Sequence, residues 1–224
     1  MDEFLQGETS RRIIVAAESL FAERGYDGTS MRNIAQKAGV NLAASHYHHG
    51  DKEALYLLVL SRRLRTINET RLSLLAQAEQ EAKGQPVPMT RILEILSRPL
   101  FELCADSRSG GRYFARILGR SLVEPLPFMD AILAREFQPV MARFTQALRR
   151  HVPNLSPEEF LWRLGFVIGA MHHTLATMHC MKDLTHGICR NHDHAGAGPR
   201  FIHFAAMTLS ATRSSDPATA SQSG

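Results

Sequence analysis

Residues 30–50 show the pattern of two short helices joined by a tight turn. Ser30 can cap the first helix with its side chain, and Gly39 supplies the φ > 0 conformation that ends it. Asn41 can cap the second helix, and the small Ala35 lets the two helices cross closely at a steep angle. Such a pair is a helix-turn-helix, whose second helix can enter a major groove of DNA.

The residues of the second helix carry a resemblance to a known family. The run GVNLAASHYHHGDKEAL resembles the recognition-helix segment of the TetR family of transcriptional regulators, where one branch reads roughly NLAAVNYHFGSKEAL. The matching residues are Asn41, Leu42, Ala43, Ala44, Tyr47, His48, Gly50, Lys52 and Glu53. The earlier elements GY, TS, IA and AGV also match, around Gly25, Thr29, Ile34 and Gly39. Beyond about the first sixty residues, the resemblance is limited to an all-helical layout and a likeness to fatty-acid-responsive members.

The resemblance implies an all-α fold in two parts. Residues 8–53 are expected to form a three-helix DNA-binding domain that contains the helix-turn-helix. Residues 54–213 are expected to form a helical bundle that binds an effector and makes a homodimer. Residues 214–224 are poor in hydrophobic side chains, which predicts a disordered tail.

Four positions depart from the family pattern. They are Ser45, His46, Asp51 and His49, and the last stands where an aromatic Phe is usual. Ser45 and His49 are four residues apart, so they share the helical face that should be buried. A hydrogen bond between them would offset the loss of two apolar contacts, and without it the recognition helix would be less firmly seated.

The resemblance also implies a set of DNA contacts. The expected set is Thr29, Arg32, Asn41, Leu42, Ala43, His46, Tyr47, His48 and Lys52. Tyr47, His48 and Lys52 are suited to phosphates, because each side chain can donate a hydrogen bond. Arg32 and His46 are the candidates for reading bases, since Leu42 and Ala43 can offer only apolar contact to a thymine methyl group. The alternative is that this face is merely solvated.

Net charge adds little to the case for DNA binding. The chain of 224 residues has a net charge of +4 and a sequence pI near 9.2. Residues 1–60 nevertheless carry six Lys or Arg and eight Asp or Glu, which gives 6 − 8 = −2. The argument therefore rests on the motif and on where the few cations lie.

Composition also bears on the compartment. No apolar run reaches the roughly 18 residues that span a bilayer, and the N-terminus MDEFLQGET is acidic, unlike a signal peptide. Cys104, Cys180 and Cys189 are far apart, which favours free thiols over a disulfide framework. We expect a cytoplasmic protein that does not bind membranes.

Apolar spacing predicts helices along the whole chain. The first helix is expected to begin at Thr9 or Ser10 and to end at Gly25. A helix of roughly 30 residues, about 45 Å long, runs from its cap Asp51 to about Glu81. Further helices are expected at 90–104, 111–122, 127–151, 157–182 and 199–212, with no convincing strand. The long helix would relay movement between the two parts.

The second part contains a spread of large apolar residues and two cations. The candidate ligand-pocket residues are Phe101, Phe114, Arg116, Leu118, Arg120, Phe128, Phe144, Trp162, Phe166 and Met171. Any helical core holds such apolar residues, so the resemblance is what suggests a small-molecule effector. A fatty acid or acyl-CoA is favoured, with the arginines available for an acidic head group. An aromatic or cationic drug-like ligand remains the alternative.

Two helical segments near the C-terminus are candidates for a dimer interface. One carries Phe160, Leu164, Val167, Met171, Leu175 and Met178, and the other carries Phe201, Phe204, Ala205, Thr208 and Leu209. The resemblance implies that these faces pair with their symmetry mates as a four-helix bundle.

Seven of the eleven histidines fall between His172 and His203, together with Cys180 and Cys189. These residue types can bind zinc, but their spacing matches no recognised metal motif. We expect no metal and no cofactor. A solvated or pH-sensitive segment is the interpretation we favour.

Motifs of common enzymes are missing from the sequence. It contains no GxSxG, HExxH, Walker loop or dinucleotide fingerprint, and GRSLV at 119–123 fails the nucleophile-elbow pattern. We therefore expect a transcriptional regulator and no catalytic activity. A DNA-binding architectural protein without an effector is the remaining alternative.

Overall fold

A computed structural model describes residues 7–106, 110–121 and 126–211, so the tail predicted at 214–224 lies outside the described residues. This part of the chain is helical and contains no strand, which confirms the all-α prediction. Its helices are α1 (Glu8–Arg24), α2 (Met31–Ala38), α3 (Leu42–His49), α4 (Lys52–Glu81), α5 (Met89–Ala105), α6 (Gly111–Ser121), α7 (Met129–Arg149), α8 (Pro157–Thr177), α9 (Met181–Leu184) and α10 (His194–Ser210).

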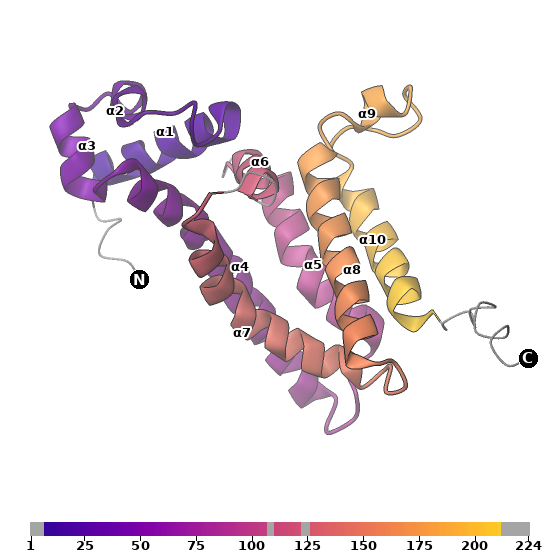
Figure 1. The fold of residues 1–224 in the computed structure, drawn as a ribbon. Coiled ribbons are helices and arrows are strands. Elements are labelled where there is room, and N and C mark those ends of the chain that lie inside the picture. Colours follow the sequence, from indigo (N-terminus) through magenta and orange to yellow (C-terminus); the bar gives the residue numbers. More distant parts are fainter. Residues whose placement is uncertain (1–6, 107–109, 122–125, 212–224) are drawn as a thin grey trace, which may run out of the picture.

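The first three helices form a small unit that we call the head (Figure 1). The side chain of Ser30 accepts a hydrogen bond from the Asn33 backbone N–H at 3.2 Å, and Gly39 ends α2 with φ of 65°. The Asn41 side chain caps α3 by accepting from the Ala44 N–H at 2.7 Å. The local capping chemistry of the sequence therefore sets both ends of the helix-turn-helix, as expected.

Helix α4 connects the head to the other helices, which we call the body (Figure 1). Asp51 caps it by accepting from the Ala54 N–H at 2.8 Å, and it continues to Glu81 as predicted. Helix α7 lies along α4, while α5, α8 and α10 pack together beside them (Figure 1). Helix α6 contacts α1 of the head and α8 of the body, so it bridges the two parts.

Among the helix ends that differ from the predicted ones, three have a clear structural cause. Helix α1 begins after Gly7 without a side-chain cap, because the Ser10 side chain is buried and bonded to His49 instead. Helix α8 stops at Thr177, and the next carbonyl, that of Met178, accepts from the His192 N–H at 3.0 Å.

Helix α10 begins earlier than expected. Pro199 does not start it, because the Asp193 side chain caps it by accepting from the Gly196 N–H at 3.0 Å. The proline then lies inside the helix, one turn and a half from its start.

Candidate nucleic-acid interface and body pockets

One face of α3 is open to solvent. Leu42 is 38% exposed and Tyr47 is 87% exposed, and Ala43 and His46 are exposed between them. Arg32 is exposed near the start of α2. The structure thus places Leu42, Ala43 and His46 on one accessible face of α3, and Arg32 on the surface of α2.

The opposite face of α3 is held by an unexpected hydrogen bond. His49 is buried and its Nε2 lies 3.1 Å from the Ser10 hydroxyl of α1. Ser45 is fully buried, and within the described residues its hydroxyl and His49 Nδ1 have no partner. Of the two cases left open by the sequence, the Ser45–His49 bond is therefore absent, and Ser10 bonds His49 instead. Burial, as the main cause, lowers the pKa of His49, so the ring stays neutral.

The ring of His46 has a fixed tautomer when it is neutral. Its Nδ1 lies 3.0 Å from the Gly50 carbonyl oxygen, which can only accept, so Nδ1 carries the proton. Nε2 is then an acceptor. An acceptor at this position suits the amino group of adenine or cytosine in a major groove.

The predicted phosphate contacts differ in availability. Tyr47 is exposed and meets the half-buried His48 edge-on at 5.4 Å. Lys52 Nζ donates to the Tyr26 carbonyl at 3.1 Å and lies 4.0 Å from the centre of the Tyr26 ring. Tyr26 therefore positions the ammonium group at the edge of the head, a contact that the sequence analysis missed although it noted the GY element.

Thr29 and Asn41 serve the fold of the head. Thr29 is buried, and its hydroxyl lies 2.8 Å from the Gly25 carbonyl and 3.2 Å from that of Leu20. The single hydroxyl proton is used inside the protein, so the Thr29 side chain has none to donate to a phosphate. Asn41 is exposed but uses its side-chain oxygen to cap α3.

Charged and aromatic contacts join the head to α4 and α7. The buried Glu18 carboxylate accepts from Arg63 Nε at 3.0 Å and from Arg63 Nη2 at 3.1 Å. Phe128 packs against Tyr26 and Tyr56, with ring centroids 5.1 and 6.0 Å apart. Phe128 was predicted to line a ligand pocket; its ring lies at the head–body junction, and its contact with a ligand stays a prediction.

The ten candidate ligand residues do not surround one cavity. Phe101, Phe114, Leu118, Phe144 and Met171 are buried in the core. Trp162 and Phe166 lie on the outer face of α8 and are each 61% exposed, which contradicts their assignment to a pocket inside one protomer. Arg116 is exposed and Arg120 is half-buried.

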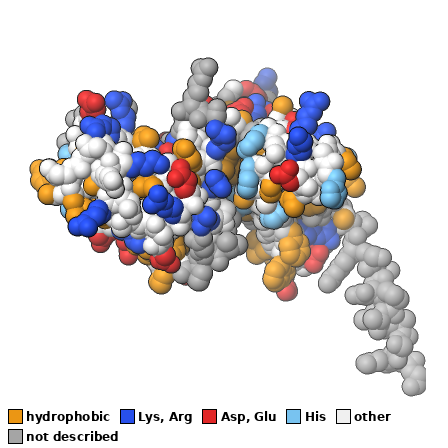
Figure 2. Space-filling model, turned by 90° about the horizontal axis from the view of Figure 1, so that it is seen from above, with side chains coloured by type: hydrophobic (Ala, Val, Ile, Leu, Met, Phe, Trp, Pro, Cys, Tyr) orange, Lys and Arg blue, Asp and Glu red, His pale blue; other side chains and the backbone are white. Residues whose placement is uncertain are grey.

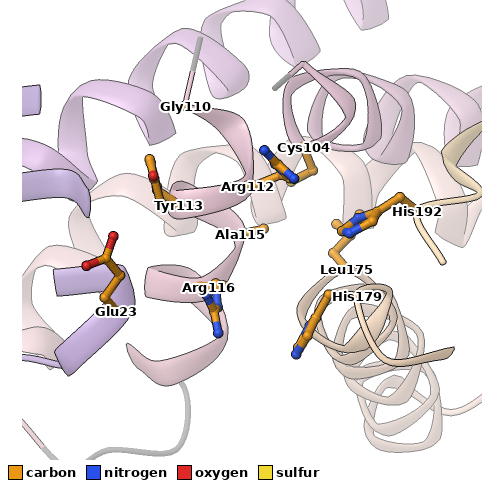
Figure 3. A pocket seen from close by; sticks show the side chains of 10 residues that line it. All are labelled: Glu23, Cys104, Gly110, Arg112, Tyr113, Ala115, Arg116, Leu175, His179 and His192. Atoms are coloured by element: carbon orange, nitrogen blue, oxygen red, sulfur yellow. The ribbon is translucent and has the colours of Figure 1, made fainter. Parts of the chain in front are cut away.

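Three of the hollows along the body helices matter for ligand binding. Phe101 lines a groove of about 650 Å³ between α5 and α10, and Phe204 lines one of about 670 Å³ that also touches α8. A third pocket of about 370 Å³ lies where α1, α5, α6 and α8 meet (Figure 3). It is lined by Glu23, Cys104, Gly110, Arg112, Tyr113, Ala115, Arg116, Leu175, His179 and His192.

A polar group that the sequence analysis missed is buried between α4, α5, α7 and α8. Arg71 Nε donates to the Leu96 carbonyl at 2.7 Å, and Arg71 Nη2 has no partner within the described residues. Asn68 donates to the Glu136 carbonyl at 2.6 Å. Burial and the nearby charge of Arg71 lower the pKa of His172 to about 4. The signal available in the sequence was the polar pair 68 and 71 on the apolar side of α4.

Among residues 7–106, 110–121 and 126–211, no group of three or more His, Cys, Asp or Glu side chains is placed to hold a metal ion. None of the described helices is long and apolar enough to cross a membrane.

Two family models match the chain. Residues 13–59 match "Bacterial regulatory proteins, tetR family". Residues 94–207, just over half of the chain, match "Tetracyclin repressor-like, C-terminal domain". The chain belongs to the TetR family. TetR-family proteins are transcriptional regulators and not enzymes, so the expected lack of catalytic activity is confirmed. The boundary expected after residue 53 stays a prediction.

Curated TetR-family relatives match part of the chain. The HTH-type transcriptional regulator TtgR of Pseudomonas putida is 32% identical over 102 residues, which is 46% of each chain. The biofilm operon negative transcriptional regulator IcaR of Staphylococcus epidermidis is 40% identical over 45 residues, 20% of this chain and 24% of IcaR. The matched segments thus span less than half of these relatives.

Solved structures are similar over nearly the whole chain. The fatty acid degradation regulator FadR from Bacillus halodurans has a TM-score of 0.67 and 16% identity, and covers 91% of this chain and 99% of its own. The hemolysin II transcriptional regulator HlyIIR has a TM-score of 0.54 and 18% identity, with 88% and 96% covered. At these identities the likeness shows the shared fold.

Proposed function

We propose that this TetR-family protein is a cytoplasmic repressor that binds a roughly palindromic operator as a homodimer and leaves it when an acyl effector binds the body. The observation that carries the DNA part is the exposed face of α3, where His46 and Tyr47 stand clear of the head. A two-fold symmetric protein matches a two-fold symmetric site. IcaR, a negative regulator by name, supports repression.

The exposed side chains of the head divide into two roles. Arg32 and His46 read base edges, and Leu42 with Ala43 contacts thymine methyl groups. Tyr47, His48 and Lys52 hold phosphates, and these contacts fix the register of α3 without reading sequence.

The dimer forms through the outer faces of α8 and α10. The exposed large apolar residues there are Leu161, Trp162, Phe166, Phe204 and Met207, each at least 46% exposed. A contiguous apolar surface of this kind marks an interface. Gly165 and Gly169 stand beside Phe166, and a Cβ added at either would meet nothing within 4 Å, so a partner helix can approach closely there.

Most of the residues named from the sequence for this interface do not lie on the surface of the protomer. The residues buried inside the protomer are Phe160, Leu164, Val167, Met171 and Leu175 of α8, Met178 just after it, and Phe201, Ala205 and Leu209 of α10. Phe204 is the one large apolar residue of that set left exposed among them. The interface therefore uses the next face of each helix.

The effector is a fatty acid or acyl thioester. FadR, which regulates fatty acid degradation, shares the fold, and Arg116 with Arg120 supplies positive charge on α6 for an acidic head group. An effector can shift the DNA-binding equilibrium only through different affinities for the two states. Helix α4 spans the head and the body, and the Glu18–Arg63 pair fixes α1 to it, so a tilt of α4 moves α3.

A panel of acyl compounds tests the effector proposal. The purified chain is melted with each compound, and the same compounds are titrated against the chain bound to a labelled operator. Compounds that raise the melting temperature should also release DNA, because both measure binding to one folded state. If no compound raises the melting temperature or releases DNA, acyl compounds are excluded as effectors, and aromatic or cationic ligands are tested next.

A further inference from the structure

The pocket of about 370 Å³ at the head–body junction has two walls, one with arginine side chains and the other with histidine side chains. Arg112 and Arg116 come from α6, one helical turn apart. His179 comes from the turn between α8 and α9, and His192 from the segment before α10. Figure 3 shows the two arginines on one side of the pocket and the two histidines on the other. Seen from above, Lys or Arg and His side chains lie on either side of this junction (Figure 2).

The two arginines lack acidic partners. In the described ranges neither Arg112 nor Arg116 makes a hydrogen bond or an ion pair, whereas Arg63 and Arg163 of other helices pair with glutamates. The pocket has one carboxylate, Glu23 at the α1 rim, and that group pairs with Lys37 at 3.6 Å. Cations gathered without anions repel one another, and a bound anion would remove that cost.

The histidines are placed to add to this attraction. His179 Nδ1 donates to the Ala176 carbonyl at 2.9 Å, which leaves Nε2 of that ring for a ligand. Burial, then the charges of Arg112 and His179, lower the pKa of His192. The positive charges of the pocket therefore disfavour protonation of the His192 ring, and a bound anion would favour it instead.

The floor of the pocket is apolar. Cys104 is 1% exposed, and it lies with Ala115 and Leu175 beneath the charged rim. Burial raises the pKa of the Cys104 thiol to about 12, so this sulfur is a neutral, apolar surface. A charged rim over an apolar floor fits a ligand that has an anionic end and a short apolar segment.

We propose that this pocket binds the anionic end, a carboxylate or a phosphate, of a small amphipathic ligand, with Arg112, Arg116, His179 and His192 around the charge and Cys104 and Leu175 under the apolar segment. This proposal rests on the proposed function in that both place the acidic head group of a ligand at Arg116, whereas binding in the pocket can be measured without DNA. Helix α6 contacts both α1 and α8, so a ligand that draws Arg112 and Arg116 towards α8 acts next to the head.

Calorimetry on the full chain at constant ionic strength tests the site with four probes. They are hexanoate and hexyl phosphate, which have both parts, 1-hexanol, which lacks the charge, and inorganic phosphate, which lacks the tail. We expect hexanoate, hexyl phosphate or both to bind at least tenfold more tightly than 1-hexanol and inorganic phosphate. The better of the two identifies the head group.

Variants assign the binding to these residues. The double substitution Arg112→Gln with Arg116→Gln should weaken the binding at least tenfold, while Arg150→Gln, at an exposed arginine at the end of α7, should leave it unchanged. His192→Gln should reduce the tightening of hexanoate binding expected on going from pH 8 to pH 6.5, because an anion favours the protonated ring and the carboxylate keeps its charge over this range. Melting curves check that each variant is folded, and the histidine variant provides a second test if the double variant is not.

The results separate the site from the regulatory function. Equal binding of 1-hexanol, or an undiminished affinity in the folded double variant, overturns the site. Tight binding without any release of operator DNA supports the binding site and contradicts its role in regulation. Release of DNA by a long-chain acyl compound that the double variant does not alter keeps the function and overturns the site.

Discussion

At the scale of single residues, His46 and Lys52 should have different effects on DNA binding. His46→Ala removes a base contact of about 1–3 kcal/mol, so the preferred sequence should change. Lys52→Met keeps an unbranched side chain but removes a phosphate contact, so binding to all sequences should weaken and the salt slope should fall by about 1. Binding curves for several operators at three salt concentrations measure both. Equal effects of the two substitutions would contradict the assigned roles.

His172 gives the chain a stability that depends on pH. Its pKa in the folded chain is about 4, below the usual value near 6.5, so between these values the unfolded chain binds more protons. Stability should therefore fall as pH falls, by about 2 kcal/mol from pH 7.5 to pH 5 from this residue. Urea unfolding at both pH values measures it.

The matched variant for this prediction is His172→Gln, which should lose that part of the pH dependence while keeping the part due to other groups. Arg71→Met should raise the pKa of His172 by removing a nearby positive charge, and burial should still hold it below the usual value. A His172 that titrates near 6.5 in the folded chain would contradict the buried polar group.

At the scale of helices, α8 is apolar on two faces, and only the structure shows which one is covered. Phe166→Glu should give monomers that stay folded and lose operator affinity, because it places a charge on the exposed face. Ala205→Glu should lower the melting temperature, since that position is 0% exposed within the protomer. Sedimentation and melting curves distinguish the two. A Phe166→Glu variant that remains a dimer moves the interface elsewhere.

The same comparison shows what the sequence could predict. Ser30, Asn41 and Asp51 cap their helices as expected, because capping depends on residues within one turn. The predicted end of α8 was wrong, because the helix ends where the backbone N–H of His192, a residue outside that helix, donates to the Met178 carbonyl.

The candidate site residues, too, could be predicted where the local sequence decides their position, and could not where distant residues decide it. The exposed positions of α3 could be read from helical register alone, since one face of a short helix must pack on the head. Trp162 and Phe166 were assigned to a pocket because period and size cannot tell a covered apolar face from an open one. Lys52 over Tyr26, and the pocket of Arg112 and His192, join residues distant in sequence, and only the fold brings them together.

At the scale of the whole molecule, the effector and the operator must each weaken the binding of the other by the same factor. If an acyl compound weakens operator binding by a given factor, the operator must weaken binding of that compound by the same factor. Titrations of each ligand in the presence and absence of the other measure both factors. Unequal factors would show that the compound competes for DNA or binds elsewhere than in the folded regulator.

The most direct test of the account is selection of operators from a pool of random duplexes by the wild-type chain and by His46→Ala. We expect the wild-type protein to enrich a palindrome bound by two protomers, with half-sites about one helical turn apart. The His46→Ala protein should enrich a palindrome of the same spacing with a different base at one position of each half-site. No enriched sequence, or the same sequence for both proteins, would contradict the claim that α3 reads DNA.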